Sequence, residues 1–144
     1  MLVQQILKSK DGAGVITVSP GSKVADAANI LSVKRIGTVV VSSDGESLDG
    51  ILSERDIVRE LGKRGAACLD EAVEGLMTSE IITCTPQDSE DAVLEMMTKG
   101  RFRHLPVMEG GRMIGLISIG DVVKARLAEL SMEKDALQGM IMGH

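Results

Sequence analysis

Two short segments of the chain repeat one arrangement of residues that could hold a small ligand. The pattern Gly-aliphatic-aliphatic-Ser-x-x-Asp occupies residues 50–56 and recurs at residues 115–121. If a helix starts in each segment, its free N–H groups and dipole attract a phosphate, and the serine adds a hydroxyl donor. Asp56 and Asp121 can accept hydrogen bonds from two vicinal hydroxyls, as the acidic residue of dinucleotide folds does with ribose. Diol and phosphate recognition together indicate a nucleotide.

The same spacing also has a purely structural interpretation. A serine followed three residues later by an acidic residue, ahead of an apolar run, forms a capping box that satisfies the first N–H groups of a helix. For one copy alone, capping is the commoner reason for this pattern. Ligand binding and helix capping therefore both stay open at this point.

The motif belongs to a larger internal repeat. Residues 15–20, Val-Ile-Thr-Val-Ser-Pro, match residues 81–86, Ile-Ile-Thr-Cys-Thr-Pro, at an offset of 86 − 20 = 66. The two motif copies follow at an offset of 115 − 50 = 65. Upstream, residues 3–7 match residues 73–77 at an offset of 70, so the first copy has a longer loop between Ser9 and Gly14. The chain is thus predicted to be a tandem repeat.

Each copy has the pattern of strand, helix, strand, strand, helix. In the first copy we expect strands at 15–18, 38–41 and 51–52, with Ser22 capping the helix between the first two. In the second copy the corresponding strands are expected at 81–84, 105–108 and 116–117, with Asp88 as the cap. Turns are predicted at Asp44-Gly45 and Gly110-Gly111. The final helix of each copy is expected to start near the motif aspartate, at Ile57 and Val122, and the first of them to end near Gly62 and Gly65.

This element order predicts an α/β (α+β) fold of two tandem repeats. One such unit has too little apolar surface to be stable alone, so we expect the two to pack sheet to sheet about a pseudo-twofold axis, with a ligand in the cleft between them. The predicted division is repeat 1 at residues 1–65, a linker at 66–72, repeat 2 at 73–130 and a C-terminal helical extension at 131–144.

Composition excludes several other classes of protein. A formal net charge of −5 is unlike that of proteins that wrap nucleic acid, and with no Trp or Tyr and one Phe the chain lacks stacking platforms for bases. No apolar run reaches the roughly 20 residues of a membrane span, and the N-terminus does not resemble a signal peptide, so a cytoplasmic location is expected. Cys68 and Cys84 have no metal-ligand spacing and are predicted to be small buried thiols. No metal site is predicted.

Enzyme motifs are also missing from the sequence. It contains no Gly-x-Ser-x-Gly, no phosphate-loop lysine motif and no His-Glu-x-x-His. Cys84 and His104 form only two members of a possible nucleophile arrangement, and such a pair is common by chance. We therefore expect a protein that is not an enzyme and has no catalytic cofactor.

With these features in view, the chain resembles a tandem cystathionine-β-synthase (CBS) domain pair of the stand-alone bacterial signal-transduction type. The resemblance rests on the element order, the Thr-Val-Ser-Pro and Thr-Cys-Thr-Pro segments and the doubled Gly-x-x-Ser-x-x-Asp motif. It extends from Val3 to about Lys124. The family binds adenosine ligands such as AMP, ADP, ATP, NAD or S-adenosylmethionine, and the resemblance implies such a ligand here.

The resemblance also implies the residues that would contact the nucleotide. Asp56 and Asp121 would hold ribose, with Ser53 and Ser118 on the phosphate side. Adenine would be bordered by Ile16, Thr17, Ile82 and Thr83 and by the starts of the middle strands at Ile36, Gly37, Arg103 and His104. The residues between serine and aspartate differ, with Glu54-Arg55 in one copy and Ile119-Gly120 in the other. The two sites are therefore expected to differ in affinity or in ligand.

A basic cluster stands out in this acidic chain. Lys99, Arg101, Phe102, Arg103 and His104 form a nearly continuous run. Together with Arg35 and Arg55 it could neutralise a di- or triphosphate, although a solvated strand edge explains it equally well.

The C-terminal part of the last helix carries an apolar stripe. Val123, Leu127, Leu130, Leu137 and Ile141 are spaced by four and three residues, with Lys134 as an interruption. The stripe exceeds what one small repeat needs to cover and predicts a homodimer.

The leading hypothesis is thus a non-catalytic module that binds an adenine nucleotide, senses energy or redox state and signals to a separate partner protein. Two alternatives stay open: an enzyme that hydrolyses or transfers nucleotides, and a purely structural dimerisation module in which both motifs are only caps. The sequence does not indicate which nucleotide is physiological, how many sites are occupied, whether Mg²⁺ accompanies the ligand or which protein is the partner.

Overall fold

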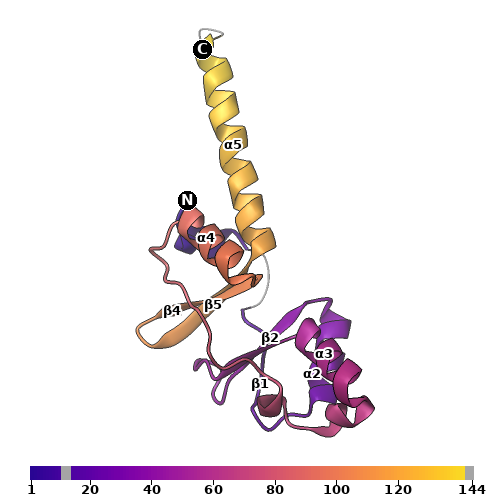
Figure 1. The fold of residues 1–144 in the computed structure, drawn as a ribbon. Helices are drawn as coiled ribbons and strands as arrows, with labels where there is room; N and C mark the ends of the chain where they lie inside the picture. The colour runs from indigo at the N-terminus through magenta and orange to yellow at the C-terminus, as the bar shows by residue number, and fades with distance from the viewer. Residues whose placement is uncertain (11–13, 142–144) are drawn as a thin grey trace. The chain divides into compact units, whose positions relative to one another are not determined.

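The computed structural model describes residues 1–10 and 14–141, and its chain trace divides into two compact units (Figure 1). We name each unit after the motif aspartate that it contains. The Asp121 unit comprises the described residues of Met1–Gly12, Thr83–Met108 and Gly115–His144. The Asp56 unit comprises those of Ala13–Ile82 and Glu109–Ile114. Gly12, in the longer loop expected between Ser9 and Gly14, lies outside the described residues.

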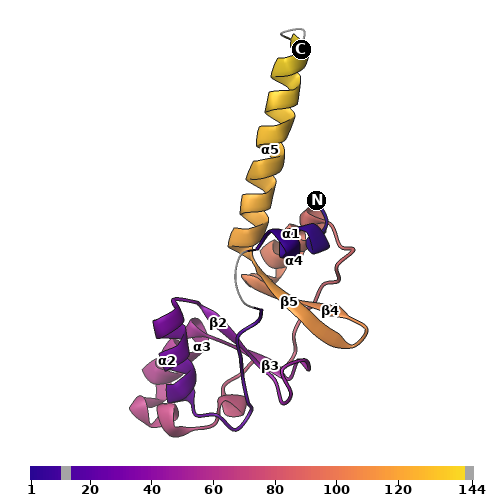
Figure 2. The same ribbon diagram turned by 180° about the vertical axis from the view of Figure 1, so that it is seen from behind.

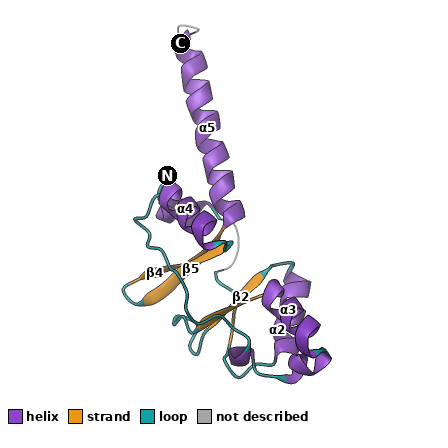
Figure 3. Ribbon diagram, viewed as in Figure 1, coloured by secondary structure: helices purple, strands orange, loops and turns teal. Residues whose placement is uncertain are grey.

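The Asp56 unit is a three-stranded sheet with two helices. Its strands β1 (Thr17–Val18), β2 (Thr38–Val41) and β3 (Gly50–Ser53) lie in that order, with β1 parallel and β3 antiparallel to β2. Every residue of β2 is buried, as expected for a β-branched run at the centre of a sheet. Helices α2 (Val24–Lys34) and α3 (Glu54–Arg64) lie side by side against the sheet (Figures 1 and 3), followed by the 3-10 turns η1 (Ala66–Asp70) and η2 (Val73–Gly75).

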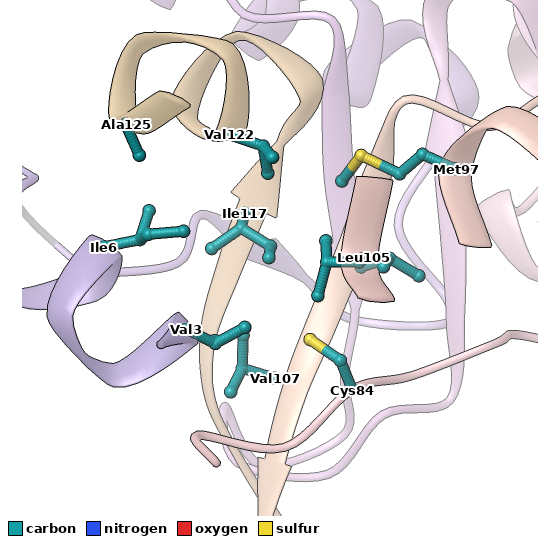
Figure 4. Packing of buried hydrophobic residues seen from close by; sticks show 10 residues of the cluster. Val3, Ile6, Cys84, Met97, Leu105, Val107, Ile117, Val122 and Ala125 are labelled. Carbon is teal, nitrogen blue, oxygen red and sulfur yellow. The ribbon is translucent and has the colours of Figure 1, made fainter. Parts of the chain in front are cut away.

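The Asp121 unit pairs a two-stranded sheet with three helices. The strands are β4 (His104–Glu109) and β5 (Arg112–Ser118), whose residues next to the turn, from Glu109 to Ile114, are assigned to the Asp56 unit. The helices are α1 (Val3–Ser9), α4 (Glu90–Gly100) and α5 (Ile119–Ile141). Helices α1 and α4 pack beside the first turns of α5, whose remaining length extends away from the unit (Figure 2). Apolar side chains from all of these elements form the buried cluster of Figure 4, which holds Val3, Ile6, Cys84, Met97, Leu105, Val107, Ile117, Val122 and Ala125.

The two repeats exchange their leading segments. The Val3 and Gln4 N–H groups of α1 donate to the carbonyls of Asp88 and Pro86, at 2.9 and 3.0 Å, in the second repeat. In the same way, the N–H groups of Val73 and Glu74 donate to Ser22 and Pro20, at 2.7 and 3.3 Å, in the first repeat. The leading segments are 73 − 3 = 70 residues apart and their acceptors 88 − 22 = 66, so the exchange is symmetric in sequence. The division of the sequence at residues 65, 72 and 130 remains a proposal and differs from the division into compact units.

The exchange explains the glycine of each motif. A Cβ added to Gly115 would lie 2.7 Å from Leu7 Cδ2 of α1, and a Cβ added to Gly50 would collide with the Met77 side chain. Leu7 and Met77 occupy equivalent places in the two leading segments, since 77 − 7 = 70. Each motif glycine therefore makes room for a side chain of an exchanged segment, a packing role that needs no ligand.

Both predicted helix caps were wrong. The N-cap of α2 is Lys23 rather than Ser22, and the N-cap of α4 is Ser89 rather than Asp88. Ser22 Oγ lies 2.8 Å from Ser19 Oγ, and the Asp88 carboxylate accepts from the Thr85 N–H at 2.8 Å. Both side chains thus serve the turn before the helix.

The helices that follow the motifs start at Glu54 and Ile119, three residues before the predicted Ile57 and Val122. The reason is that the serine is the N-cap, which puts the aspartate inside the first turn. The strand expected at 81–84 is reduced to one bridge, from Cys84 to Val107. The strand expected at 15–18 is shortened to Thr17–Val18. The remaining predicted strands and both glycine turns are confirmed, with positive φ at Gly45, Gly110 and Gly111.

Candidate functional site

The first motif forms a complete capping box. Ser53 Oγ accepts a hydrogen bond from the Asp56 N–H at 3.2 Å, and Asp56 Oδ2 accepts from the Ser53 N–H and hydroxyl, both at 2.9 Å. The other carboxylate oxygen, Oδ1, accepts from the Arg59 guanidinium at 2.7 Å. Asp56 is buried, whereas Arg59 is half exposed. The capping interpretation of this motif is therefore confirmed, and its carboxylate has a partner on each oxygen.

The second motif repeats the cap with a different cation. Asp121 Oδ2 accepts from the Ser118 N–H at 2.8 Å, and Ser118 Oγ accepts from the Asp121 N–H at 3.1 Å. The Lys10 ammonium lies 2.9 Å from the same Oδ2 and donates to the Leu116 carbonyl at 2.6 Å. Burial works to raise the pKa of Asp121, but these donors outweigh it and hold the pKa below its usual range. Asp121 is therefore ionised at neutral pH.

Lys10 was missed at the sequence level. It lies at the end of α1, outside both motif copies, and reaches Asp121 only because α1 packs in the unit of the second repeat. The one signal that could have found it is the offset of 70 that relates the leading segments, yet that offset pairs Lys10 with Glu80, a residue of opposite charge.

The starts of the middle strands meet the motifs as predicted. The Gly37 carbonyl accepts from the Glu54 N–H at 2.9 Å, and the Arg103 carbonyl accepts from the Ile119 N–H at 2.8 Å. The positions are equivalent, since 103 − 37 = 66 and 119 − 54 = 65. In each unit, this hydrogen bond therefore places the start of the middle strand beside the first turn of the helix that contains the capped aspartate.

The residues expected to border adenine lie on neighbouring backbone. In the Asp56 unit Thr17 pairs with Val40, the Ile16 carbonyl accepts from the Val40 N–H at 3.1 Å, and Ile36 is half-buried before β2. In the second copy Ile82 and Thr83 are exposed and immediately precede the Cys84 bridge, and His104 begins β4. The boundary between the two compact units falls between Ile82 and Thr83, so Ile82 belongs to the Asp56 unit.

Arg35 and Arg101 have a backbone feature in common that the sequence did not indicate. They end α2 and α4 in the left-handed conformation, with φ of 55° and 57°, where glycine is the usual residue. Both arginines are exposed, as is Arg55. Holding a side-chain residue in this conformation costs about 1–3 kcal/mol and is tolerated most often at functional positions.

The residues of the basic cluster are near-neighbours in the sequence but have different surroundings in the structure. Lys99 pairs with Glu95 at 2.8 Å along α4, so its charge is already compensated. Phe102 packs against the buried cluster of the Asp121 unit. Arg103 and Arg101 are exposed. Lys99 is exposed as well, but it already has a carboxylate partner, so the two arginines are the better candidates to contact a phosphate.

The family model for the CBS domain matches this chain twice, at residues 11–63 and 73–128. The chain belongs to the CBS domain family. A CBS domain-containing protein from Arabidopsis thaliana, described as mitochondrial, is 36% identical over 140 residues, which cover 94% of this chain and 68% of the relative.

Solved CBS structures have the same fold. A CBS-domain containing protein from Agrobacterium tumefaciens has a TM-score of 0.83 at 44% identity and covers 88% of this chain and 99% of its own. At 23% identity, where the likeness shows the fold alone, a CBS protein from Pyrobaculum aerophilum complexed with AMP has a TM-score of 0.77, covering 92% and 99%. A CBS domain pair in complex with 5′-methylthioadenosine and S-adenosyl-L-methionine has a TM-score of 0.76, also at 23%, covering 90% and 98%.

The two cysteines of this CBS chain are free and buried, as predicted. Burial raises the pKa of the Cys84 thiol to about 12. A thiol with this pKa is protonated at neutral pH, so Cys84 fits a core residue of the second CBS repeat rather than a nucleophile beside His104. In the described part of the chain, no helix is long and apolar enough to cross a membrane.

Proposed function

We propose that this CBS protein is a non-catalytic regulatory module that binds an adenine nucleotide, AMP, ADP, ATP or NAD, and reports energy or redox state to a partner protein. One observation carries the proposal. In the second CBS repeat an ionised carboxylate, Asp121, is held at a helix start beside the backbone of Arg103. The AMP and S-adenosylmethionine complexes of proteins with the same fold support an adenosine ligand.

In this proposal the carboxylate accepts hydrogen bonds from the ribose hydroxyls. Adenine lies against aliphatic side chains and backbone at the strand starts, since the chain has no Trp or Tyr to stack on it. The exposed arginines at positions 101 and 103 would face the phosphates of a di- or triphosphate. Binding a flat ring between aliphatic groups, with one carboxylate to select ribose, suits reversible sensing because none of these groups performs chemistry.

The capping boxes favour one competing function, a structural module whose motifs hold no ligand. Ser53 both accepts from the Asp56 N–H and donates to its carboxylate, so this serine already has partners within the cap. A second copy of the chain is the proposed assembly partner, because α5 carries exposed apolar residues beyond the body of its unit. A cytoplasmic location also remains part of the proposal.

Calorimetric titration with AMP, ATP and NAD, with GTP as a control, separates these functions. We expect saturable binding of at least one adenine nucleotide and weaker or no binding of GTP. Melting curves give an independent measure, because a ligand at about 100 times its Kd stabilises the fold by about 2.7 kcal/mol. If no adenine nucleotide gives heat or raises the melting temperature, the structural module is correct. Conversion of ATP to product in the presence of Mg²⁺ would instead indicate the enzyme.

A further inference from the structure

The two motif aspartates differ at one carboxylate oxygen. In both copies Oδ2 serves the cap by accepting from the serine N–H. Oδ1 of Asp56 accepts from the Arg59 guanidinium at 2.7 Å. Oδ1 of Asp121 has no partner within residues 1–10 and 14–141, because Lys10 bonds to the oxygen already used by the cap. A hydroxyl can thus reach Asp121 without breaking an existing contact.

The residue of the second copy that corresponds to Arg59 shows why the copies differ. Lys124 occupies the equivalent place in the second copy, since 124 − 59 = 65, and it is exposed with no ion pair to Asp121 among the described contacts. The Asp121 side chain is also the more accessible of the two, with 24% of its surface exposed against 12% for Asp56. Both observations leave the second carboxylate open.

The helix starts differ in a second, independent way. Position 120 is a glycine inside the first turn of α5, while its counterpart in α3 is Arg55. A Cβ at Gly120 would meet only Ser118 Oγ, at 3.6 Å, which is an ordinary contact, and Gly120 has no positive φ. The fold therefore does not require glycine here, and a helical glycine costs about 0.5–1 kcal/mol relative to alanine. Close approach of a ligand to the backbone is the remaining reason to keep it.

From these differences we infer that the second CBS repeat holds the high-affinity nucleotide site, with Asp121 Oδ1 and the Gly120 backbone as its contacts, while Arg59 keeps the first repeat closed. The inference rests on the proposed function and adds which copy performs it. A ribose hydroxyl at Asp56 Oδ1 must compete with the half-exposed Arg59 guanidinium, which should lower the affinity of that copy by up to about fivefold.

Calorimetry on the full chain with AMP tests the inference. For the wild-type protein we expect one tight equivalent per chain. Asp121→Asn should lower the affinity of that equivalent by about 10- to 150-fold, and Asp56→Asn should leave it unchanged. Arg59→Met keeps the aliphatic stem but removes the guanidinium, and it should strengthen a second equivalent. Two wild-type sites of equal affinity, equal losses from the two Asn variants, or no gain from Arg59→Met would each contradict the inference.

A glycine variant guards against the case in which Asp121→Asn disturbs the fold. Gly120→Ala should raise the melting temperature of the nucleotide-free protein and yet weaken AMP binding. Gly139→Ala, in the same helix and with nothing within 4 Å of the added Cβ, is the matched control that should stabilise without affecting AMP. If Gly120→Ala binds AMP as tightly as Gly139→Ala does, the second copy is not the site. Absence of AMP, ATP and NAD binding by the wild-type protein would overturn the proposed function itself.

Discussion

Each motif aspartate is paired with a cation, and the two cations come from different parts of the chain. Arg59 stands three residues after Asp56 on the same helix, a spacing at which side chains are neighbours. Lys10 reaches Asp121 from the end of α1. The first pair is a local consequence of helix geometry, whereas the second depends on where α1 packs. A twofold repeat of sequence thus produces two chemically different carboxylates.

The motif glycines give the first prediction at this scale. Gly115→Ala should destabilise the fold by about 1–3 kcal/mol, because its Cβ would overlap Leu7 in a packed core. Urea unfolding measures the loss. Gly62→Ala, in α3 with open space around the added Cβ, should instead stabilise by about 0.5–1 kcal/mol. Adding Leu7→Ala to Gly115→Ala should recover part of the loss, and additive losses in the double variant would rule out this contact as the cause.

The basic side chains at the start of β4, exposed Arg103 and half-buried His104, give the second prediction. Replacing Arg103 or His104 with alanine should weaken ATP by about 1 kcal/mol, roughly fivefold, and leave adenosine nearly unchanged, because adenosine lacks the phosphates that these groups would neutralise. Calorimetric titration with both ligands checks this. Lys99→Ala is the matched control, since Lys99 already pairs with Glu95 and should affect neither ligand. Equal losses for ATP and adenosine would mean that Arg103 and His104 shape the adenine side instead.

At the scale of elements, the helices are held together by a charge cluster as well as by the core. Glu90 begins α4 and is only 3% exposed, and its Oε1 accepts from Arg126 of α5 at 3.2 Å. Its other oxygen has no hydrogen-bond partner among the described residues. Asp91, Glu129 and the amino group of Met1 lie around the same contact. Burial is the main cause that raises the pKa of Glu90.

This raised pKa predicts a pH dependence of known sign. A carboxyl group whose folded-state pKa is raised stabilises the fold below its ordinary pKa and loses that contribution as the pH rises through the folded-state value. Glu90→Gln imitates the protonated form, so it should gain stability relative to wild type as the pH rises from about 4 to about 8. Urea unfolding of both proteins across this range gives the difference.

The control for this effect has the opposite sign. Lys99 lowers the pKa of Glu95, so Glu95→Gln should lose stability relative to wild type as the pH rises to the ordinary carboxyl pKa, and the difference should stay level above it. If the difference in unfolding free energy between Glu90→Gln and wild type does not change with pH, the pKa of Glu90 is not raised in the folded state.

At the scale of the whole molecule, α5 is longer than its unit can cover. Val123, Leu127, Leu130, Leu137 and Ile141 are all exposed, from 44% to 75%, and recur at the alternating spacing of four and three typical of helix pairing. Only Val122 and Ala125, near its start, are buried. The apolar stripe predicted from the sequence is therefore present, and a second copy of the chain is its proposed cover.

Disruption of this stripe tests the dimer. The wild-type protein should sediment as a dimer at micromolar concentration, and Leu130→Asp should sediment as a monomer because a charge would be buried in the helix pair. Met132→Asp, on the opposite side of α5 and 67% exposed, should remain a dimer. A wild-type monomer, or equal behaviour of the two variants, would contradict the proposed pairing.

The sequence by itself determined what depends on short-range spacing. β-Branched runs located β2, and the serine-to-aspartate spacing predicted both capping boxes, because these patterns involve residues a few positions apart. The repeat offsets of 65 to 70 residues revealed the tandem CBS pair, because they compare two copies of such local patterns. The positions of the helix N-caps already depended on contacts with distant parts of the chain. Lys23 and Ser89 became N-caps in place of Ser22 and Asp88, and each forms a backbone bridge to an exchanged segment, at Ala72 and Leu2. Sequence reasoning had no access to those bridges.

Only the tertiary structure decided which carboxylate is open and why the motif glycines are there. The exchange of leading segments brings Lys10 to Asp121 and Leu7 to Gly115, in each case from the other end of the sequence. Such contacts follow from where a helix finds an apolar surface to cover, and α1 finds it on the second repeat. Neither composition nor periodicity encodes that choice, because the same apolar residues would suit either repeat equally well.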